Sequence, residues 1–139
     1  MSVPEHFSRV FWGKFVSPDS YLPLAAHCLD VAMVFRALCN LDGFARTLER
    51  AAGRSLSPQC LDRLSVIAML HDVGKANHGF QSKVFDSTAP KAGHIRELAP
   101  ILDPEVLDAT LADRFLKLLP ENFLSWFESQ EDAYSYFLA

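Results

Sequence analysis

The sequence lacks any long uninterrupted run of apolar residues. Its first fifteen residues, MSVPEHFSRVFWGKF, contain no apolar stretch of signal-peptide type. No later segment approaches the roughly 20 apolar residues that a membrane-spanning helix needs. These absences predict a soluble, cytoplasmic protein with no membrane partner.

Closely spaced cysteines are also missing. The three cysteines, Cys28, Cys39 and Cys60, form no CxxC pair. Cys28 and Cys39 fall within a strongly apolar helical pattern, which is typical of reduced core thiols in a cytoplasmic protein. We therefore expect no disulfide.

The chain has no excess of basic residues either. Thirteen Lys and Arg residues stand against seventeen Asp and Glu residues, for a net charge of −4 with neutral histidines. Proteins that bind nucleic acid by overall electrostatic attraction are normally basic. Any contact with nucleic acid must therefore come from a local site or from a bound metal.

Apolar residues, by contrast, are plentiful. They make up half of the 139 residues, enough for the core of one compact domain over residues 1–139. They recur at intervals of three and four rather than two, which indicates helices. We predict an all-α fold without strands.

The first predicted helix lies in the segment after Pro18. We expect Asp19 or Ser20 to cap it, with Pro23 in its first turn. Its apolar positions form one predicted buried stripe of Leu24, Cys28, Val31, Phe35 and Leu38.

Two further helices have clear end signals. One is predicted from about Asp42 to Ala52, with Gly53 ending it. The next has Ser57 as its cap and Pro58 at its first position, and runs through an apolar last turn until Gly74 breaks it.

Helices are predicted in the remaining sequence as well. A short one is expected over 77–85 and another near His94. Asp103 and Pro104 repeat the cap-and-proline pattern and predict a long amphipathic helix with Val106, Leu107, Leu111, Phe115 and Leu118 on one side. Residues 122–139 are expected to form one or two aromatic-rich helices.

The segment with the clearest chemical character is His71-Asp72-Val73-Gly74-Lys75. Adjacent imidazole and carboxylate groups at a helix end can bind one cation, so His71 and Asp72 are candidate metal ligands. Gly74 lets the backbone turn sharply, and Lys75 is then within reach of a bound phosphate, where its charge would stabilise a transition state. In an alternative interpretation, His71 and Asp72 only cap the helix and Lys75 is a solvated charge.

His27 lies beside the apolar stripe of the first predicted helix. Taken alone, such a histidine is more often a core residue than a ligand. Its context, YLPLAAHCLDV over 21–31, changes this interpretation. Together with HDVGKANHGFQSK and the preceding Trp12-Gly13-Lys14, it resembles the opening motifs of the HD nuclease domain in the type I CRISPR helicase-nuclease. The resemblance covers most of the chain.

The resemblance implies an HD-domain-like helical bundle and a role for each polar residue of these motifs. It makes His27, His71 and Asp72 metal ligands, with Asp72 and Lys75 as catalytic residues. Lys75 would also contact the substrate phosphate, and His94 would serve a second metal. We interpret His78, which follows the HDxGK motif, as a substrate contact rather than a ligand.

For the family, the implied reaction is hydrolysis of phosphodiester bonds in single-stranded DNA with one or two divalent metal ions. Mn, Fe, Co or Ni suits His and carboxylate ligands better than Mg, which is a further option. The implied partners are the DNA strand, a helicase domain and the type I CRISPR effector complex.

The sequence departs from the family pattern after His94. A complete domain of this kind looks to supply an adjacent His-His pair and a later Asp, and no histidine follows His94. We therefore expect the amino-terminal part of an HD domain, truncated on its C-terminal side and with an incomplete metal site. Two alternatives stay open: an inactive decoy or inhibitor that occupies the nuclease docking site of the CRISPR effector, and an HD phosphohydrolase that acts on a nucleotide.

Overall fold

The computed structural model describes residues 10–17, 19–103, 105–129, 131–133 and 135. The chain divides into two compact units, one ending at Val73 and one beginning at Gly74. Helices dominate the structure, as predicted. The single domain predicted over residues 1–139 stays a prediction.

The first element of the described residues is a β-hairpin, so the prediction that the chain has no strands was wrong. Strand β1 (Trp12–Ser17) pairs antiparallel with β2 (Ser20–Pro23). The aromatic and β-branched residues of this segment favour extended backbone. Because β2 takes up Ser20, neither predicted residue caps α1 (Leu24–Leu38), which starts directly after Pro23 without a side-chain cap.

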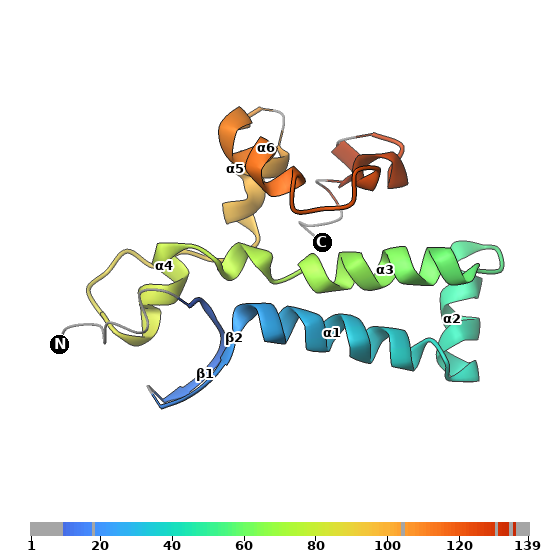
Figure 1. Ribbon diagram of the computed structural model, residues 1–139, viewed down its shortest axis with the longest axis horizontal. Helices are drawn as coiled ribbons and strands as arrows, with labels where there is room; N and C mark the ends of the chain where they lie inside the picture. Colours follow the sequence, from blue (N-terminus) through green and yellow to red (C-terminus); the bar gives the residue numbers. More distant parts are fainter. Residues whose placement is uncertain (1–9, 18, 104, 130, 134, 136–139) are drawn as a thin grey trace. The chain divides into compact units, whose positions relative to one another are not determined.

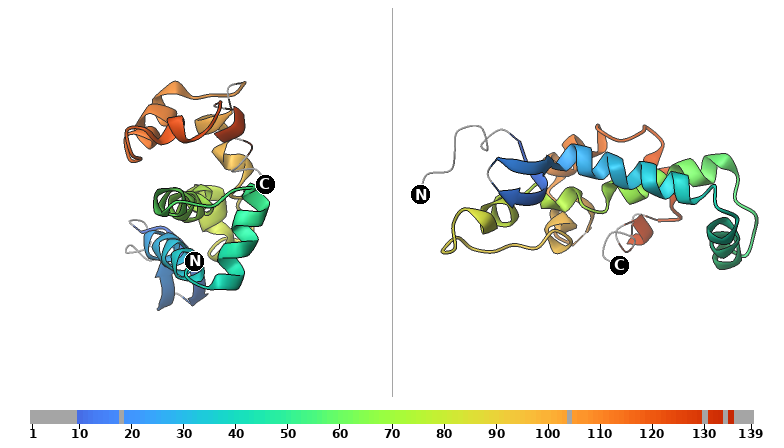
Figure 2. Two further views of the ribbon diagram at one scale, coloured as in Figure 1. Left: turned by 90° about the vertical axis from the view of Figure 1, so that its right-hand side faces the viewer. Right: turned by 90° about the horizontal axis from the view of Figure 1, so that it is seen from below.

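Helix α1 and α3 (Pro58–Leu70) lie side by side and run in opposite directions, with α2 (Asp42–Ala52) at one end of the pair (Figures 1 and 2). The beginning of α1 and the end of α3 therefore meet at the other end. This arrangement brings together two segments that are far apart in the sequence.

The predicted stripe of α1 is buried mainly at the start of the helix. Leu24 and Cys28 are buried, Val31 and Phe35 are half-buried, and Leu38 is 37% exposed. His27, on the same turn as these first residues, is only 8% exposed. Cys28, Cys39 and Cys60, all within the described residues, form no disulfide.

The end signal predicted for α2 and the start signals predicted for α3 are confirmed, but Gly74 does not end α3. This helix stops at Leu70, and Gly74 lies in the 3₁₀ helix η2 (Val73–Lys75) that follows. Gly53 ends α2 in the left-handed region at φ 65°. The hydroxyl of Ser57 accepts a hydrogen bond from the Cys60 backbone N–H at 3.2 Å, and Pro58 is the first residue of α3.

Gly53→Ala is expected to destabilise the protein by about 1 kcal/mol, because a side chain in the left-handed region is strained. Nothing lies within 4 Å of an added Cβ there, so backbone strain would be the whole effect. Gly43→Ala is the matched control, since it lies inside α2 with equally open surroundings and should be neutral or slightly stabilising. Urea unfolding measures both, and equal stabilities would contradict the prediction.

The second unit is built from short helical elements. The helix predicted over 77–85 is present as α4 (His78–Gln81) followed by the 3₁₀ helix η3 (Ser82–Val84), with Asn77 as cap. Near His94, the chain forms the 3₁₀ helix η4 (Arg96–Leu98), which leads into α5 (Ala99–Leu102). Helix α5 packs against α6 (Ala109–Leu116).

The prediction of a long helix starting at Asp103 was wrong. Asp103 accepts a hydrogen bond from Glu105 N–H in a turn, and α6 starts only at Ala109. Asp108 is the actual cap, because its carboxylate accepts from the N–H groups of Thr110 and Leu111, both at 3.0 Å. Pro104 lies outside the described residues.

After α6, the chain forms the 3₁₀ helix η5 (Phe123–Trp126), whose Phe123 is buried against Trp126 and Phe127. Residues 131–133 and 135 are helical, whereas residues 130, 134 and 136–139 of the predicted terminal segment lie outside the described part. No single helix of the described residues is long and apolar enough to cross a membrane. The pair α1 and α2 meets that test only together, with a 94° bend between them.

Candidate metal centre

Three of the predicted ligands come together in the first unit. His27 lies in the first turn of α1, His71 caps the end of α3, and Asp72 follows it. One ligand atom from each side chain lies within 4.8 Å of the others. The antiparallel packing of α1 and α3 explains this meeting, because it joins the start of one helix to the end of the other.

The carboxylate of Asp72 is the centre of the group. Its Oδ2 lies 2.7 Å from His27 Nε2 and 3.1 Å from His71 Nε2. Asp72 is 4% exposed, whereas the side chain of His71 is 48% exposed. A buried carboxylate is costly unless it is paired. The group is therefore closed on the side of His27 and open to solvent on the side of His71.

The second ring nitrogen of His71 fixes which nitrogen faces the centre. Nδ1 lies 2.7 Å from the carbonyl oxygen of Ala68. A carbonyl only accepts, so Nδ1 carries the proton and donates. In the neutral ring, Nε2 is then the unprotonated nitrogen, which is the form that binds a metal. His71 thus caps the end of α3, as the alternative interpretation of the sequence expected. It also presents a ligand atom toward Asp72.

This donor set suits a divalent cation. In a neutral His71, the lone pair of Nε2 faces the Asp72 carboxylate oxygen, an arrangement that a proton or a cation between them would stabilise. Two imidazoles and one carboxylate are typical ligands of transition metals, and three protein ligands leave positions for water or substrate. The metal roles of His27, His71 and Asp72 stay predictions that this geometry supports.

Gly13 lies directly against His27. A Cβ added at Gly13 would lie 2.5 Å from His27 Cβ and 3.0 Å from Cγ. Gly13 sits where the register of β1 shifts between Trp12 and Lys14, a typical site for a glycine that allows close approach. The hairpin that the sequence analysis missed therefore supports the ring of a candidate ligand.

Gly13→Ala is expected to weaken binding of Mn²⁺ roughly 10- to 100-fold, the size of effect seen when the support of a metal ligand is disturbed. The added methyl group would force the His27 side chain away from Asp72. Calorimetric titration with Mn²⁺ measures the change, with Gly43→Ala as the control because it meets no atom within 4 Å. Unchanged affinity in Gly13→Ala would contradict the prediction that close packing of Gly13 positions His27 as a ligand.

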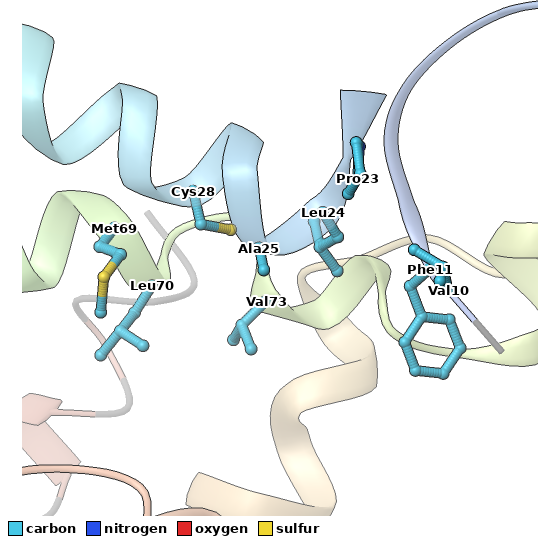
Figure 3. Close-up of a pocket in the computed structure, with 9 residues that line it drawn as sticks. All are labelled: Val10, Phe11, Pro23, Leu24, Ala25, Cys28, Met69, Leu70 and Val73. Carbon is cyan, nitrogen blue, oxygen red and sulfur yellow. The ribbon is translucent and has the colours of Figure 1, made fainter. Parts of the chain in front are cut away.

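Two hollows border α1. The larger, about 470 Å³, is lined only by uncharged side chains (Figure 3): Val10, Phe11, Pro23, Leu24, Ala25, Cys28, Met69, Leu70 and Val73. It offers no charge to bind a phosphate. A second hollow of about 370 Å³ includes His27, Lys14 and Asp30, so it has both charge and a candidate ligand in its wall.

The remaining predicted site residues belong to the second unit. Lys75 is half-buried, and its Nζ lies 5.8 Å from the centre of the Phe80 ring. His94 packs edge-on against the same ring, at 5.5 Å between ring centres. His78 is exposed at the start of α4. Their roles toward phosphate, a second metal and substrate stay predictions.

Two residues that pack against predicted site residues or their neighbours were not predicted from the sequence. Gly13 was visible only as part of the Trp12-Gly13-Lys14 segment, and its contact with His27 requires the hairpin. The Nζ atom of Lys83 lies 4.3 Å from the centre of the Phe80 ring. The signal that could have indicated this contact is the spacing of three residues between Phe80 and Lys83, which places both on one helical face.

Comparison with known proteins identifies the family of the chain. Searches of curated proteins and of solved structures found no match. The family model described as the Cas3 HD domain matches residues 12–116, a range that contains all the predicted site residues. The match confirms the resemblance and the HD-domain-like helical fold. Because it spans more than half of the sequence, the chain belongs to the Cas3 HD-domain family, a family of metal-dependent phosphohydrolase and nuclease domains.

Proposed function

We propose that this chain hydrolyses phosphodiester bonds of single-stranded DNA in type I CRISPR interference. The observation that carries the proposal is the group of His27, His71 and Asp72, with ligand atoms within 4.8 Å of one another. It lies in a chain whose family consists of metal-dependent phosphohydrolases. The exposure of His71 gives a substrate access to the group.

Each residue has a defined task in this proposal. His27, His71 and Asp72 hold a divalent cation, for which Mn, Fe, Co or Ni fits the donors best. When bound, such a cation supplies Lewis acidity that activates water and polarises a phosphoryl group. Buried Asp72 keeps the two imidazoles oriented, and Lys75 contributes a positive charge toward the substrate phosphate.

The chain would work with larger partners. A net charge of −4 disfavours holding DNA by overall attraction. We propose that a helicase domain and the cytoplasmic CRISPR effector complex deliver the strand. They would supply most of the affinity, while the metal group acts on the phosphodiester.

The test is cleavage of a labelled single-stranded oligonucleotide by purified protein with Mn²⁺, Ni²⁺, Co²⁺ or Mg²⁺. We expect cleavage with a transition metal and none with EDTA. Free nucleoside triphosphates are assayed in parallel, and hydrolysis of these instead of DNA would favour a nucleotide phosphohydrolase. If the protein cuts neither substrate and competes with an active nuclease for the effector complex, it is a decoy and the proposal is wrong.

A further inference from the structure

The chain has a basic excess in one segment of the second unit. Residues 74–97 contain four basic residues, Lys75, Lys83, Lys91 and Arg96, against two acidic ones. Residues 98–139 contain two basic and eight acidic residues. Although the whole chain has a net charge of −4, residues 74–97, which directly follow His71 and Asp72 in the sequence, carry a net positive charge.

Both carboxylates of this segment have local hydrogen bonds. Asp86 accepts from the backbone N–H and the hydroxyl of Thr88. Glu97 accepts from the backbone N–H of Gly93 at 2.5 Å. These contacts stabilise the loop between η3 and η4.

Two lysine ammonium groups of this segment lie near the aromatic ring of Phe80. Lys83 Nζ lies 4.3 Å and Lys75 Nζ 5.8 Å from its centre, and the His94 ring contacts it edge-on. An ammonium near an aromatic face is attracted by the ring quadrupole. We call Lys75, Phe80, Lys83 and His94 the Phe80 cluster. Attraction to the ring restrains both flexible lysine side chains, which lowers the entropy lost when they bind an anion.

The loop before His94 adds to the same region. Ala92 lies so close to α4 that a Cβ on Gly79 would be 2.6 Å from Ala92 Cβ. Asn77 donates to the carbonyl oxygen of Gly93 at 3.0 Å. The loop, drawn beside α4 in Figure 1, is thus fixed against this helix and carries the exposed Lys91.

We propose that the Phe80 cluster binds the phosphate backbone of single-stranded DNA, with exposed Lys83 as its principal contact. The inference rests on the proposed nuclease function, for which it supplies a strand contact outside the metal group. Affinity for nucleic acid comes mainly from Lys and Arg near phosphates. Both ammonium groups lie within 5.8 Å of one ring centre, so one backbone can reach them together.

The test measures binding of a fluorescein-labelled oligothymidylate to the full chain by anisotropy, in EDTA and at several salt concentrations. Lys83→Gln is expected to weaken binding at low salt about three- to ten-fold and to lower the slope of log affinity against log salt by about 0.7, one contact on a single strand. Phe80→Leu should weaken binding about two- to five-fold, because it removes the ring that positions both lysines. Affinity for Mn²⁺ should be unchanged in Lys83→Gln.

Lys117→Gln is the matched control. It removes the same charge from a lysine paired with Asp113 at 2.6 Å on α6, away from the basic segment in sequence. Equal losses in Lys83→Gln and Lys117→Gln, or no binding of the oligonucleotide by the unchanged protein, would overturn the proposal. EDTA prevents cleavage, so the assay measures strand binding alone. If binding depends on Lys83 but the protein shows no nuclease activity with metal, the strand-binding proposal is supported and only the proposed nuclease function is refuted.

Discussion

Asp72→Ala is expected to lower the affinity for Mn²⁺ by more than about 100-fold and to abolish DNA cleavage. Changes to groups that merely support a metal ligand cost 10- to 100-fold in affinity, so the loss of a direct ligand should cost more. Asp72 Oδ2 is the atom that both His27 and His71 face, at 2.7 and 3.1 Å. Without it, two imidazoles remain and no negative charge offsets the cation.

Metal-dependent thermal stabilisation measures this effect, because a cation that binds only the folded protein raises its Tm. The unchanged protein should show a rise with Mn²⁺, and Asp72→Ala should show none. The substitution also leaves buried His27 without its partner, at a cost of about 1–3 kcal/mol. Asp72→Asn keeps an acceptor for His27 without the charge, and should recover stability but not metal binding.

Asp62→Ala is the matched carboxylate control. Asp62 is an exposed residue of α3 that pairs with Arg36 at 2.9 Å. Such surface pairs contribute about 0–1 kcal/mol. Asp62→Ala should therefore keep the metal-induced rise in Tm. If Asp72→Ala keeps it as well, the cation binds elsewhere.

Gly74→Ala is expected to destabilise the second unit by about 3 kcal/mol or more, at the upper end of overpacking effects. An added Cβ would lie 1.7 Å from the backbone oxygen of His94 and 2.7 Å from its carbonyl carbon. Backbone atoms cannot move aside as a flexible side chain can. The two segments would have to separate, and this would break the bridge in which Asn77 donates to the carbonyl oxygens of Gly74 and Gly93 at 2.6 and 3.0 Å.

Hydrogen exchange measures where the Gly74→Ala structure loosens. Faster exchange is expected over residues 74–98, together with a lower midpoint of urea unfolding. Gly43→Ala again serves as control, because nothing lies within 4 Å of its added Cβ. Exchange and stability equal to those of the unchanged protein would mean that His94 does not pack on Gly74. Glycine in the HDxGK motif would then serve the turn alone.

The candidate ligands were predictable from the sequence because their chemistry is local. His71 and Asp72 are adjacent at the end of an apolar helix whose start is marked by Ser57 and Pro58. His27 needed its motif context, since a histidine beside an apolar stripe is usually a core residue. The tertiary structure adds what spacing cannot show, namely that antiparallel α1 and α3 bring His27 to Asp72.

The errors arose where one signal supported two structures. The start of a helix was predicted from Asp19, Ser20 and Pro23. In the structure, residues 20–23 instead form a strand that pairs with residues 12–17, and the helix begins after them. Asp103 precedes a proline in the same way, but its carboxylate closes a local turn and Asp108 caps α6 instead. Aspartate caps turns and helices through the same hydrogen bonds, so sequence alone does not separate them.

The central claim is that His27, His71 and Asp72 form one divalent-metal site. Calorimetric titration of metal-free protein with Mn²⁺ and Ni²⁺ tests it most directly, because it measures both the number of sites and the affinity. We predict saturable binding of a transition metal that is lost in Asp72→Ala and kept in Asp62→Ala. Absence of binding in the unchanged protein would contradict the claim and leave the three side chains as a buried structural cluster.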